Sequence, residues 1–402
     1  MPSSYDSALL EAEDLLGTEG GADARLPIPL LPAPAPARPG RSPLLGALRR
    51  PLRTLDRFVR LHFLGFSTML VLLGVASVAA EPGWIQLAGI LAVAFCFHNF
   101  AYVLNDVIDL PVDRSHPARQ DDYLVRGTIR PWQALAFALL QIPLAAGIHA
   151  FLVAGASSAG KPPLLVLLAG FGLMAVYDLW GKSCPVPPLT DLAQGLGWAS
   201  LALYGAMAMG GPPNVLTWTA VAMGTGFILL INGVHGGLRD LSNDLDRGRR
   251  TTAIFFGSRP LPPEGAPSVN PGLVAFSMAA QVALIAVHLL PLVRNEFAYS
   301  PLRLGVTGAA VLLVDIACVV WMIRVYRTGS PTWERDFRLH LFFLLLAGVV
   351  LFAPFLEPRI LFPFLFLFFW PLVFHRMTWK VVGATWRRIR AAAGLRSTPR
   401  WG

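Results

Sequence analysis

The chain has 402 residues, of which 54% are hydrophobic and only 14% are charged, and its mean hydropathy is +0.56. Soluble domains carry about 25% charged residues, so this composition excludes an ordinary soluble protein and predicts an integral membrane protein surrounded by lipid. The net charge of +9 does not predict nucleic-acid binding, because Arg and Lys gather at the ends of apolar runs and not on one amphipathic face.

The N-terminal part of the chain, residues 1–45, begins with an acidic stretch and continues as a run rich in Pro and Ala. It lacks the basic region followed by an apolar region that marks a secretory signal peptide. This composition predicts a disordered cytoplasmic tail. We expect the membrane domain to cover residues 46–376, and a second, basic cytoplasmic tail to cover residues 377–402.

Apolar runs follow one another along the middle of the chain, and a membrane-spanning helix needs about 20 such residues. The predicted spans are 61–80, 84–104, 131–154, 163–180, 189–209, 215–235, 271–292, 302–323 and 337–356. A tenth apolar run, 359–375, is shorter and contains two prolines. For this run, spanning the membrane, re-entering it and lying against the other helices are all open alternatives.

The positive charges predict the topology. Arg and Lys are concentrated in the N-terminal flank and in the loops after the second, fourth, sixth and eighth runs. This bias places the N-terminus and the even-numbered loops in the cytoplasm. The basic C-terminal tail reaches the cytoplasm only if the number of spans is even, which favours ten spans over nine. The predicted fold is therefore an all-α, polytopic bundle of nine to ten transmembrane helices.

Two acidic clusters follow the second and the sixth apolar runs, and the predicted topology places both on the cytoplasmic side. In the first cluster, Asp106, Asp109 and Asp113 are spaced i, i+3 and i+7. In the second, Asp240 and Asp244 are spaced i and i+4. Each spacing places the carboxylates of one cluster on a common helix face.

Grouped carboxylates at a membrane need a compensating partner, because each costs about 2–4 kcal/mol in or near hydrocarbon. Clustered Asp oxygens suit hard divalent cations, and Mg²⁺ completes its coordination shell with phosphate oxygens and water. Two such faces predict a site that holds a diphosphate between Mg²⁺ ions. The alternative is a pair of solvated loops in which the aspartates only cap helices, and the equivalent placement of both clusters argues against it.

At these residues the sequence resembles a known family. The segment Asn105-Asp106-x-x-Asp109-x-x-x-Asp113 is similar to the first Asp-rich motif of the UbiA-type intramembrane prenyltransferase superfamily, which includes a terpene cyclase branch. The resemblance covers about residues 55–356. The positions that resemble the second motif are Asp240, Asp244, Gly248, Thr252 and Gly257.

The resemblance implies a helical bundle around a central cavity that opens sideways to lipid. An isoprenyl diphosphate would lie with its tail in the cavity and its head on Mg²⁺ at the cytoplasmic end. The implied catalytic residues are Asp106, Asp109, Asp240 and Asp244. The implied metal ligands are Asn105, Asp106 and Asp109 for one ion and Asp240 and Asp244 for the other, with Asp113 supporting the first group. The implied substrate contacts are Tyr177, Lys182, and Arg239 or Arg119.

The sequence departs from the family after the first motif. Asp122 stands where the family commonly has an Arg, so the identity of one diphosphate contact is open, with Arg119 and Arg126 as candidates. Asp121 and Asp122 themselves are expected to belong to a solvated loop, although added metal affinity is the alternative.

Further polar residues lie close to the predicted site. His235 and Asn232 are near the end of the sixth run, and Asp191 is near the start of the fifth; all three are candidate substrate contacts. For His98, inside the second run, an interhelical hydrogen bond is the expected role. Asp315, deep in the eighth run, needs a partner that the sequence does not identify.

Aromatic residues in the same runs are candidates for lining a carbocation pocket, with core packing as the default. They are Phe97, Phe100, Trp198 and Tyr204.

The predicted function is Mg²⁺-dependent transfer of a prenyl group from an isoprenyl diphosphate to a small acceptor, such as an aromatic compound or a quinone precursor. A terpene cyclase is the alternative, because the same ionisation can be followed by internal quenching of the cation. A non-catalytic transporter or binding protein for lipid phosphates is a third alternative, which two complete Asp motifs disfavour.

Overall fold

The structure is a computed structural model that describes residues 56–78, 81–116, 119–154, 161–261, 267–327 and 332–374. Within these ranges the chain forms helices and no strand, apart from one isolated β-bridge between Arg259 and Ser268. The predicted all-α class is therefore confirmed. The two predicted tails, 1–45 and 377–402, lie outside the described residues.

Ten longer helices overlap the ten predicted apolar runs, one helix for each run. They are α3 (Leu64–Ser77), α4 (Trp84–Ile108), α6 (Pro131–Ile148), α7 (Pro162–Trp180), α8 (Pro187–Ala208), α9 (Val215–Ile228), α13 (Pro271–Val293), α14 (Pro301–Val325), α15 (Trp333–Phe352) and α16 (Pro358–Phe369). The short elements are η1 (Leu61–Phe63), α5 (Leu110–Asp113), the π-helical segments η3 (His149–Val153) and η5 (Leu229–Gly236), α10 (Gly237–Arg239), α11 (Leu241–Asp246), α12 (Thr252–Phe255) and α17 (Pro371–Phe374).

The sequence determines many of the helix starts. A proline occupies the first helical position of six longer helices, where its fixed φ suits the helix and its missing N–H is not needed. These prolines are Pro131, Pro162, Pro187, Pro271, Pro301 and Pro358. The helix α9 starts instead at a capping box, in which the Asn214 side chain accepts a hydrogen bond from the backbone N–H of Thr217 at 3.0 Å.

Six stretches of the described chain are long and apolar enough to cross a membrane. They are Trp84–Ile108, Pro131–Val153, Pro162–Trp180, Val215–Arg239, Pro271–Val293 and Pro301–Val325. The chain is therefore an integral membrane protein. The helix α16 has 12 residues and is about 18 Å long, which is less than the roughly 30 Å of a bilayer core. The number of spans stays a prediction.

The helix α3 lies among α4, α8, α9 and α16, and twelve of its fourteen residues are buried. Its closest neighbour is α8, because each helix presents a glycine to the backbone of the other. A Cβ atom on Gly74 would collide with the carbonyl oxygen of Ala202, and one on Gly205 with that of Val71. These glycines therefore allow two backbones to come into direct contact inside the bundle.

The helix α16 packs along α3 and fixes its N-terminal end. The indole Nε1–H of Trp370, directly after α16, donates a hydrogen bond to the carbonyl oxygen of Leu61 at 2.6 Å. Gly65 lies against the backbone of Leu367, where a side chain would collide. The residue before Leu61 is Arg60, which contributes to the site described below.

Polar side chains inside the predicted spans find partners on other elements. The imidazole Nδ1 of His98 lies 3.4 Å from the hydroxyl of Ser67 in α3, which confirms the predicted interhelical hydrogen bond, and its Nε2 lies 2.9 Å from the carbonyl oxygen of Val59. Asp315 of α14 has its partner in His288 of α13, at 2.8 Å between Oδ1 and Nδ1. Both side chains of this pair are at most 2% exposed, so the pair joins two helices in the bundle.

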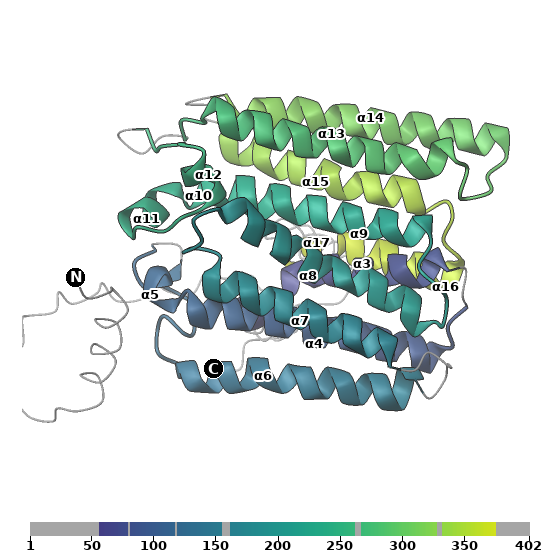
Figure 1. Cartoon of the computed structure of the whole chain (residues 1–402), viewed down its shortest axis with the longest axis horizontal. Helices are drawn as coiled ribbons and strands as arrows, with labels where there is room; N and C mark the ends of the chain where they lie inside the picture. Colours follow the sequence, from purple (N-terminus) through teal and green to yellow (C-terminus); the bar gives the residue numbers. More distant parts are fainter. Residues whose placement is uncertain are drawn as a thin grey trace, which may run out of the picture. The chain divides into compact units, whose positions relative to one another are not determined.

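Both acidic clusters lie at the same end of the long helices. Figure 1 shows α5, which carries the end of the first cluster, beside α10, α11 and α12, which surround the second. The sequence predicted this common side from charge alone. Whether that side faces the cytoplasm remains a prediction.

Candidate active site

The first cluster begins in the last turn of α4 and continues through α5, where the chain bends but keeps a helical course. Pro111 lacks a backbone N–H, so α4 stops at Ile108 and the four-residue helix α5 follows after Asp109. The backbone N–H of Asp109 still bonds the carbonyl of Asn105, and that of Asp113 bonds the carbonyl of Asp109, each at 2.9 Å. The predicted spacing along one face therefore survives the bend.

The second cluster lies beyond the π-helical segment η5. Asp240 separates α10 from α11, and the backbone N–H of Asp244 bonds its carbonyl at 2.9 Å. Gly248 then adopts a φ of 64°, a left-handed conformation that glycine adopts without strain. This turn brings the backbone N–H of Arg249 back to the carbonyl of Asp244, at 2.8 Å.

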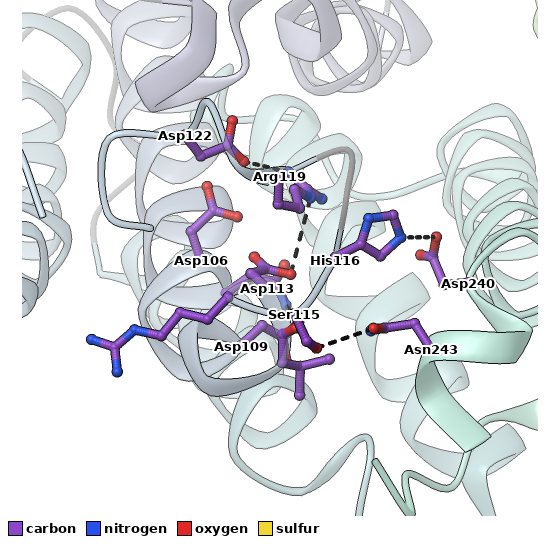
Figure 2. A network of polar contacts seen from close by, with 12 residues as sticks. Asp106, Asp109, Asp113, Ser115, His116, Arg119, Asp122, Asp240 and Asn243 are labelled. Atoms are coloured by element: carbon purple, nitrogen blue, oxygen red, sulfur yellow. Dashed lines mark hydrogen bonds and ion pairs between the residues drawn. The ribbon is translucent and has the colours of Figure 1, made fainter. Parts of the chain in front are cut away.

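The two clusters meet through the segment after α5. His116 Nε2 lies 3.6 Å from Asp240 Oδ1, and the Ser115 hydroxyl donates a hydrogen bond to Asn243 Oδ1 at 3.2 Å (Figure 2). Arg247 Nε donates to the same serine hydroxyl at 3.1 Å. Residues from distant parts of the sequence thus form one polar site at the end of the bundle.

Asp106 forms a largely buried ion pair with Arg60, which sequence reasoning had not selected. The Arg60 guanidinium also lies 5.3 Å from the centre of the Tyr102 ring, one helical turn before Asp106. Arg60 has a φ of 49°, which is uncommon for a residue with a side chain. Its position in a basic N-terminal flank indicated topology only, and nothing in the sequence places it beside an aspartate.

Asp109 is held by Lys182, which follows the fourth predicted span and reaches the first cluster. Lys182 Nζ donates to Asp109 Oδ2 at 2.9 Å. The Asn105 side chain donates to the same carboxylate at 3.2 Å and to Asp178 Oδ1, also at 3.2 Å. Asp178 is a second residue of the site that sequence reasoning missed, because it lies within an apolar run directly after Tyr177.

Two arginines near the clusters, Arg119 and Arg239, are each paired with aspartates. Arg119 lies 4.0 Å from Asp113 and 3.2 Å from Asp122, so the unusual Asp122 faces an arginine of its own loop (Figure 2). Arg239 binds Asp240 with two hydrogen bonds of 2.9 and 2.8 Å. Both arginines thus lie beside the clusters, as predicted, although each is bonded to a carboxylate.

A hollow opens beside the first cluster. Asp106, Asp113 and Asp122 line it together with Arg57 and Tyr123, as well as apolar residues of the neighbouring segments. Asp121, next in sequence, instead forms an exposed ion pair with Arg57 at 3.4 Å. This agrees with the expected solvated loop for Asp121 but places Asp122 beside the acidic site.

The carboxylates of the site are incompletely neutralised. Burial raises the pKa of the Asp244 carboxyl to about 6, because the nearby Lys182 offsets only part of the burial cost. Burial likewise raises the pKa of Asp113, against the opposing effect of Arg119. For Asp240, burial would raise the pKa, but the hydrogen bonds and the charge of Arg239, together with His116 and Lys182, outweigh burial and lower the pKa. The site therefore favours additional positive charge.

The donor atoms at this site suit a hard divalent cation, since they are carboxylate and amide oxygens. In the described residues, no three His, Cys, Asp or Glu side chains converge on one point. Asp106 is instead paired with Arg60, and Asp109 with Lys182. Mg²⁺ needs only one or two carboxylates when a phosphate completes its shell, so the residues fit Mg²⁺ bound together with a diphosphate.

The other candidate contacts are engaged with neighbouring helices. Asp191 accepts a hydrogen bond from Thr252 of α12 and lies against Gly233 of η5, whereas Asn232 donates to Gln194 of α8. The first bond fixes the segment after the second cluster onto α8, and the second fixes η5 onto the same helix.

His235 contacts a histidine of another helix. Its Nε2 lies 2.6 Å from Nδ1 of His340, and the Nε2 of His340 lies 3.2 Å from Gln281 Oε1. All three side chains are fully buried. His235 therefore belongs to a row of buried polar side chains that joins separate helices. Its role as a substrate contact stays a prediction.

An aromatic layer includes Tyr102 and Phe97 of α4, which lie about one and two and a half helical turns before Asp106. Trp198 contacts Tyr102 and Phe97, each with ring centres 5.5 Å apart, and Phe66 stacks on Phe227 at 4.6 Å. Of the four aromatic candidates, Phe97 and Trp198 belong to this layer. Phe100 joins it indirectly, because Phe100 contacts Phe171, which in turn contacts Phe97, whereas Tyr204 bonds His149.

Comparisons with known proteins agree on one family. The model of the UbiA prenyltransferase family matches residues 66–346. No curated protein sequence matches the chain.

Solved structures show the same fold at low sequence identity. The apo structure of a UbiA homologue from Aeropyrum pernix K1 is 17% identical over 74% of this chain and 99% of that chain, with a TM-score of 0.56. A digeranylgeranylglyceryl phosphate synthase is 17% identical over 76% of this chain and 96% of that chain, with a TM-score of 0.53. A UbiA homologue from Archaeoglobus fulgidus, bound to GPP and Mg²⁺, is 15% identical over 74% of this chain and 99% of that chain, with a TM-score of 0.48.

Proposed function

Because the chain belongs to the UbiA prenyltransferase family, we propose that it catalyses the Mg²⁺-dependent ionisation of an isoprenyl diphosphate and transfers the prenyl group to a small acceptor within the membrane. One observation carries this proposal. Two acidic clusters from distant parts of the sequence meet at one end of a membrane bundle, beside Lys182. A metal-bound diphosphate head and an apolar tail would find complementary surroundings there.

The proposed metal ligands are the oxygens of the two clusters. Asn105, Asp106 and Asp109 would hold one Mg²⁺, and Asp240 and Asp244 the other. Bound Mg²⁺ would neutralise the charge that develops on the departing diphosphate, which lowers the barrier to C–O cleavage. The pKa of Asp244, about 6, supports this assignment. It shows that neighbouring positive charge offsets only part of the cost of burying the carboxylate, so a bound cation would stabilise the charged form.

The cations of the site would bind the diphosphate when the metal takes over their carboxylates. Lys182 and Arg60 each hold one aspartate of the first cluster, and Arg239 holds one of the second. In the bound state these side chains would be free to turn toward phosphate oxygens. We propose that Arg60 supplies the arginine contact that Asp122 cannot provide.

The prenyl tail would extend from the clusters into the apolar interior. The aromatic layer around Trp198 lies near Asp106, where ring faces would stabilise an allylic cation after ionisation. An aromatic compound or a quinone precursor is the proposed acceptor class, because it offers electron-rich carbon to that cation. We further propose that the acidic end of the bundle faces the cytoplasm.

Replacing Lys182 with Met is expected to raise the KM for the isoprenyl diphosphate by about 10- to 100-fold, the equivalent of about 1.5–3 kcal/mol for a charged hydrogen bond. Met keeps most of the side-chain volume but removes the charge. Burial alone would lower the pKa of the lysine, yet Asp109 and Asp244 raise it above its ordinary value, so the side chain stays protonated at neutral pH. Steady-state kinetics at saturating Mg²⁺ measure the change, and an unaltered KM would contradict a phosphate contact.

One experiment tests the function directly. The purified protein is incubated with geranyl, farnesyl and geranylgeranyl diphosphates plus Mg²⁺, with and without aromatic acceptors, and the products are identified by mass spectrometry. We expect a prenylated acceptor and diphosphate release that requires Mg²⁺. A cyclic product formed without acceptor would identify a terpene cyclase instead. An absence of diphosphate release under every condition would exclude both enzymes.

A further inference from the structure

Asp178 occupies a place that packing alone does not explain. It lies in the last turn of α7, its residue is only 8% exposed, and its Oδ1 accepts a hydrogen bond from the Asn105 amide at 3.2 Å. Its second oxygen, Oδ2, is buried and has no hydrogen-bond partner among the described residues. A buried carboxylate oxygen without a partner costs several kcal/mol, so an apolar residue would stabilise this position better.

The geometry around Asn105 determines how its amide is turned. The Nδ2 group contacts two carboxylates, Asp109 Oδ2 and Asp178 Oδ1, each at 3.2 Å. A carbonyl oxygen in that place would meet two acceptors and be repelled, so only the NH₂ group fits there. Both amide hydrogens are therefore used, and the amide oxygen Oδ1 points away from the two carboxylates.

The amide oxygen of Asn105, Oδ1, is the atom that a cation would bind. No side chain in the described ranges donates a hydrogen bond to Asn105 Oδ1. An amide oxygen is a good ligand for Mg²⁺, whereas an amide NH₂ group is not. The affinity of the site for the metal thus depends on which way Asn105 is turned.

We propose that Asp178 is a positioning residue, which fixes the Asn105 amide so that Oδ1 is presented to the divalent cation of the first cluster. The inference rests on the proposed function, since that function makes Asn105 a metal ligand. Asp109 alone would leave the amide with one bond and greater freedom to turn. Asp178 adds the second bond from another helix.

The same end of α7 supplies both links to the first cluster. Lys182 follows Asp178 by four residues and bonds Asp109 at 2.9 Å. Gly181 lies between these two residues, close to the backbone of Tyr177. A side chain at this position would collide with the carbonyl oxygen of Tyr177, so the close approach requires a glycine. Asp178 and Lys182 thus bond the two first-cluster residues that face α7, Asn105 and Asp109.

Two substitutions at position 178 separate orientation from charge. Asp178→Asn keeps an acceptor for the Asn105 amide but removes the charge, whereas Asp178→Leu removes both. Binding of Mn²⁺ to the detergent-solubilised, full-length protein is measured by electron paramagnetic resonance in the presence of geranyl diphosphate and without an acceptor. Asp178→Leu is expected to weaken Mn²⁺ binding by about 10- to 100-fold, the usual effect of losing a residue that orients a metal ligand. Asp178→Asn is expected to stay close to the wild type.

A control and a second variant keep this test decisive. Gln141→Leu removes the partner of Asn99, a comparable buried amide pair between α4 and α6, and is expected to leave Mn²⁺ binding unchanged. Asn105→Leu is expected to weaken binding as much as Asp178→Leu, and it serves if Asp178→Leu does not fold.

The outcomes that would overturn the inference are distinct. Unchanged binding in Asp178→Leu or in Asn105→Leu would exclude the positioning role. Equal losses in Asp178→Asn and Asp178→Leu would show that the charge of Asp178 matters and its orientation of Asn105 does not. A wild-type protein that binds no Mn²⁺ would instead refute the proposed two-metal site itself.

Discussion

Replacement of Asp240 or Asp106 with alanine is expected to lower the rate of diphosphate release by about a thousandfold or more. Each change removes a proposed metal ligand, and the charge stabilisation that a metal ion supplies is worth several kcal/mol in the transition state, with tenfold in rate for each 1.4 kcal/mol. The two residues belong to different clusters, so both losses together would show that both clusters act. The rate is measured from released diphosphate at saturating substrate and Mg²⁺.

Asp121→Ala provides the matched control. Asp121 follows the first cluster closely, but its side chain is 73% exposed and pairs, among the residues that the structure describes, only with the half-exposed Arg57. Exposed ion pairs contribute about 0–1 kcal/mol, so this variant is expected to retain its activity and stability. Asp106→Ala also leaves Arg60 without its partner, and a thermal unfolding curve must show that the variant remains folded. Full activity in both Asp106→Ala and Asp240→Ala would refute the two-metal proposal.

Replacement of His288 with leucine is expected to destabilise the protein by about 3–5 kcal/mol, because it strands a buried carboxylate. Asp315 bonds His288 at 2.8 Å, and its other oxygen already lacks a partner among the described residues. No water is expected at this depth to replace the imidazole, since both residues lie within predicted spans. The free energy of unfolding is measured by titration with SDS in mixed micelles, followed by circular dichroism.

The double variant His288→Leu/Asp315→Leu distinguishes a stranded charge from lost packing. With both polar groups removed, the stability is expected to recover most of the loss, because no unpaired group remains between α13 and α14. A double variant that is as unstable as His288→Leu alone would contradict this explanation. Prenyl transfer by the folded fraction is expected to be unchanged, since neither residue touches the acidic clusters.

Much of the fold could be predicted because its causes are local. A run of apolar residues must form a helix in lipid, since every backbone polar group needs a partner there. Prolines such as Pro271 and Pro301 mark where helices start. The exact ends were less certain. The second helix continues to Ile108, beyond the predicted end at residue 104, because the first cluster belongs to its last turn.

The residues that complete the site could not be predicted from the sequence. Membrane topology alone explains the positive charge of the flank that contains Arg60, yet the structure pairs Arg60 with Asp106. Asp178 lies within an apolar run, and its role depends on a hydrogen bond from the Asn105 amide of another helix. His235 became a candidate substrate contact because it is near the second cluster in sequence, whereas the structure shows it bonded to His340 from the π-helical segment η5.

The sequence by itself determined the membrane environment, the all-α class, the position of the apolar helices and the two faces of aspartates. Each of these follows from composition or from periodicity within a single segment. Only the tertiary structure decided which cation neutralises which carboxylate, how the Asn105 amide is turned, and which partner Asp315 finds. Such pairings join residues of separate helices, and their energies depend on distances of a few ångströms that arise only when the helices pack.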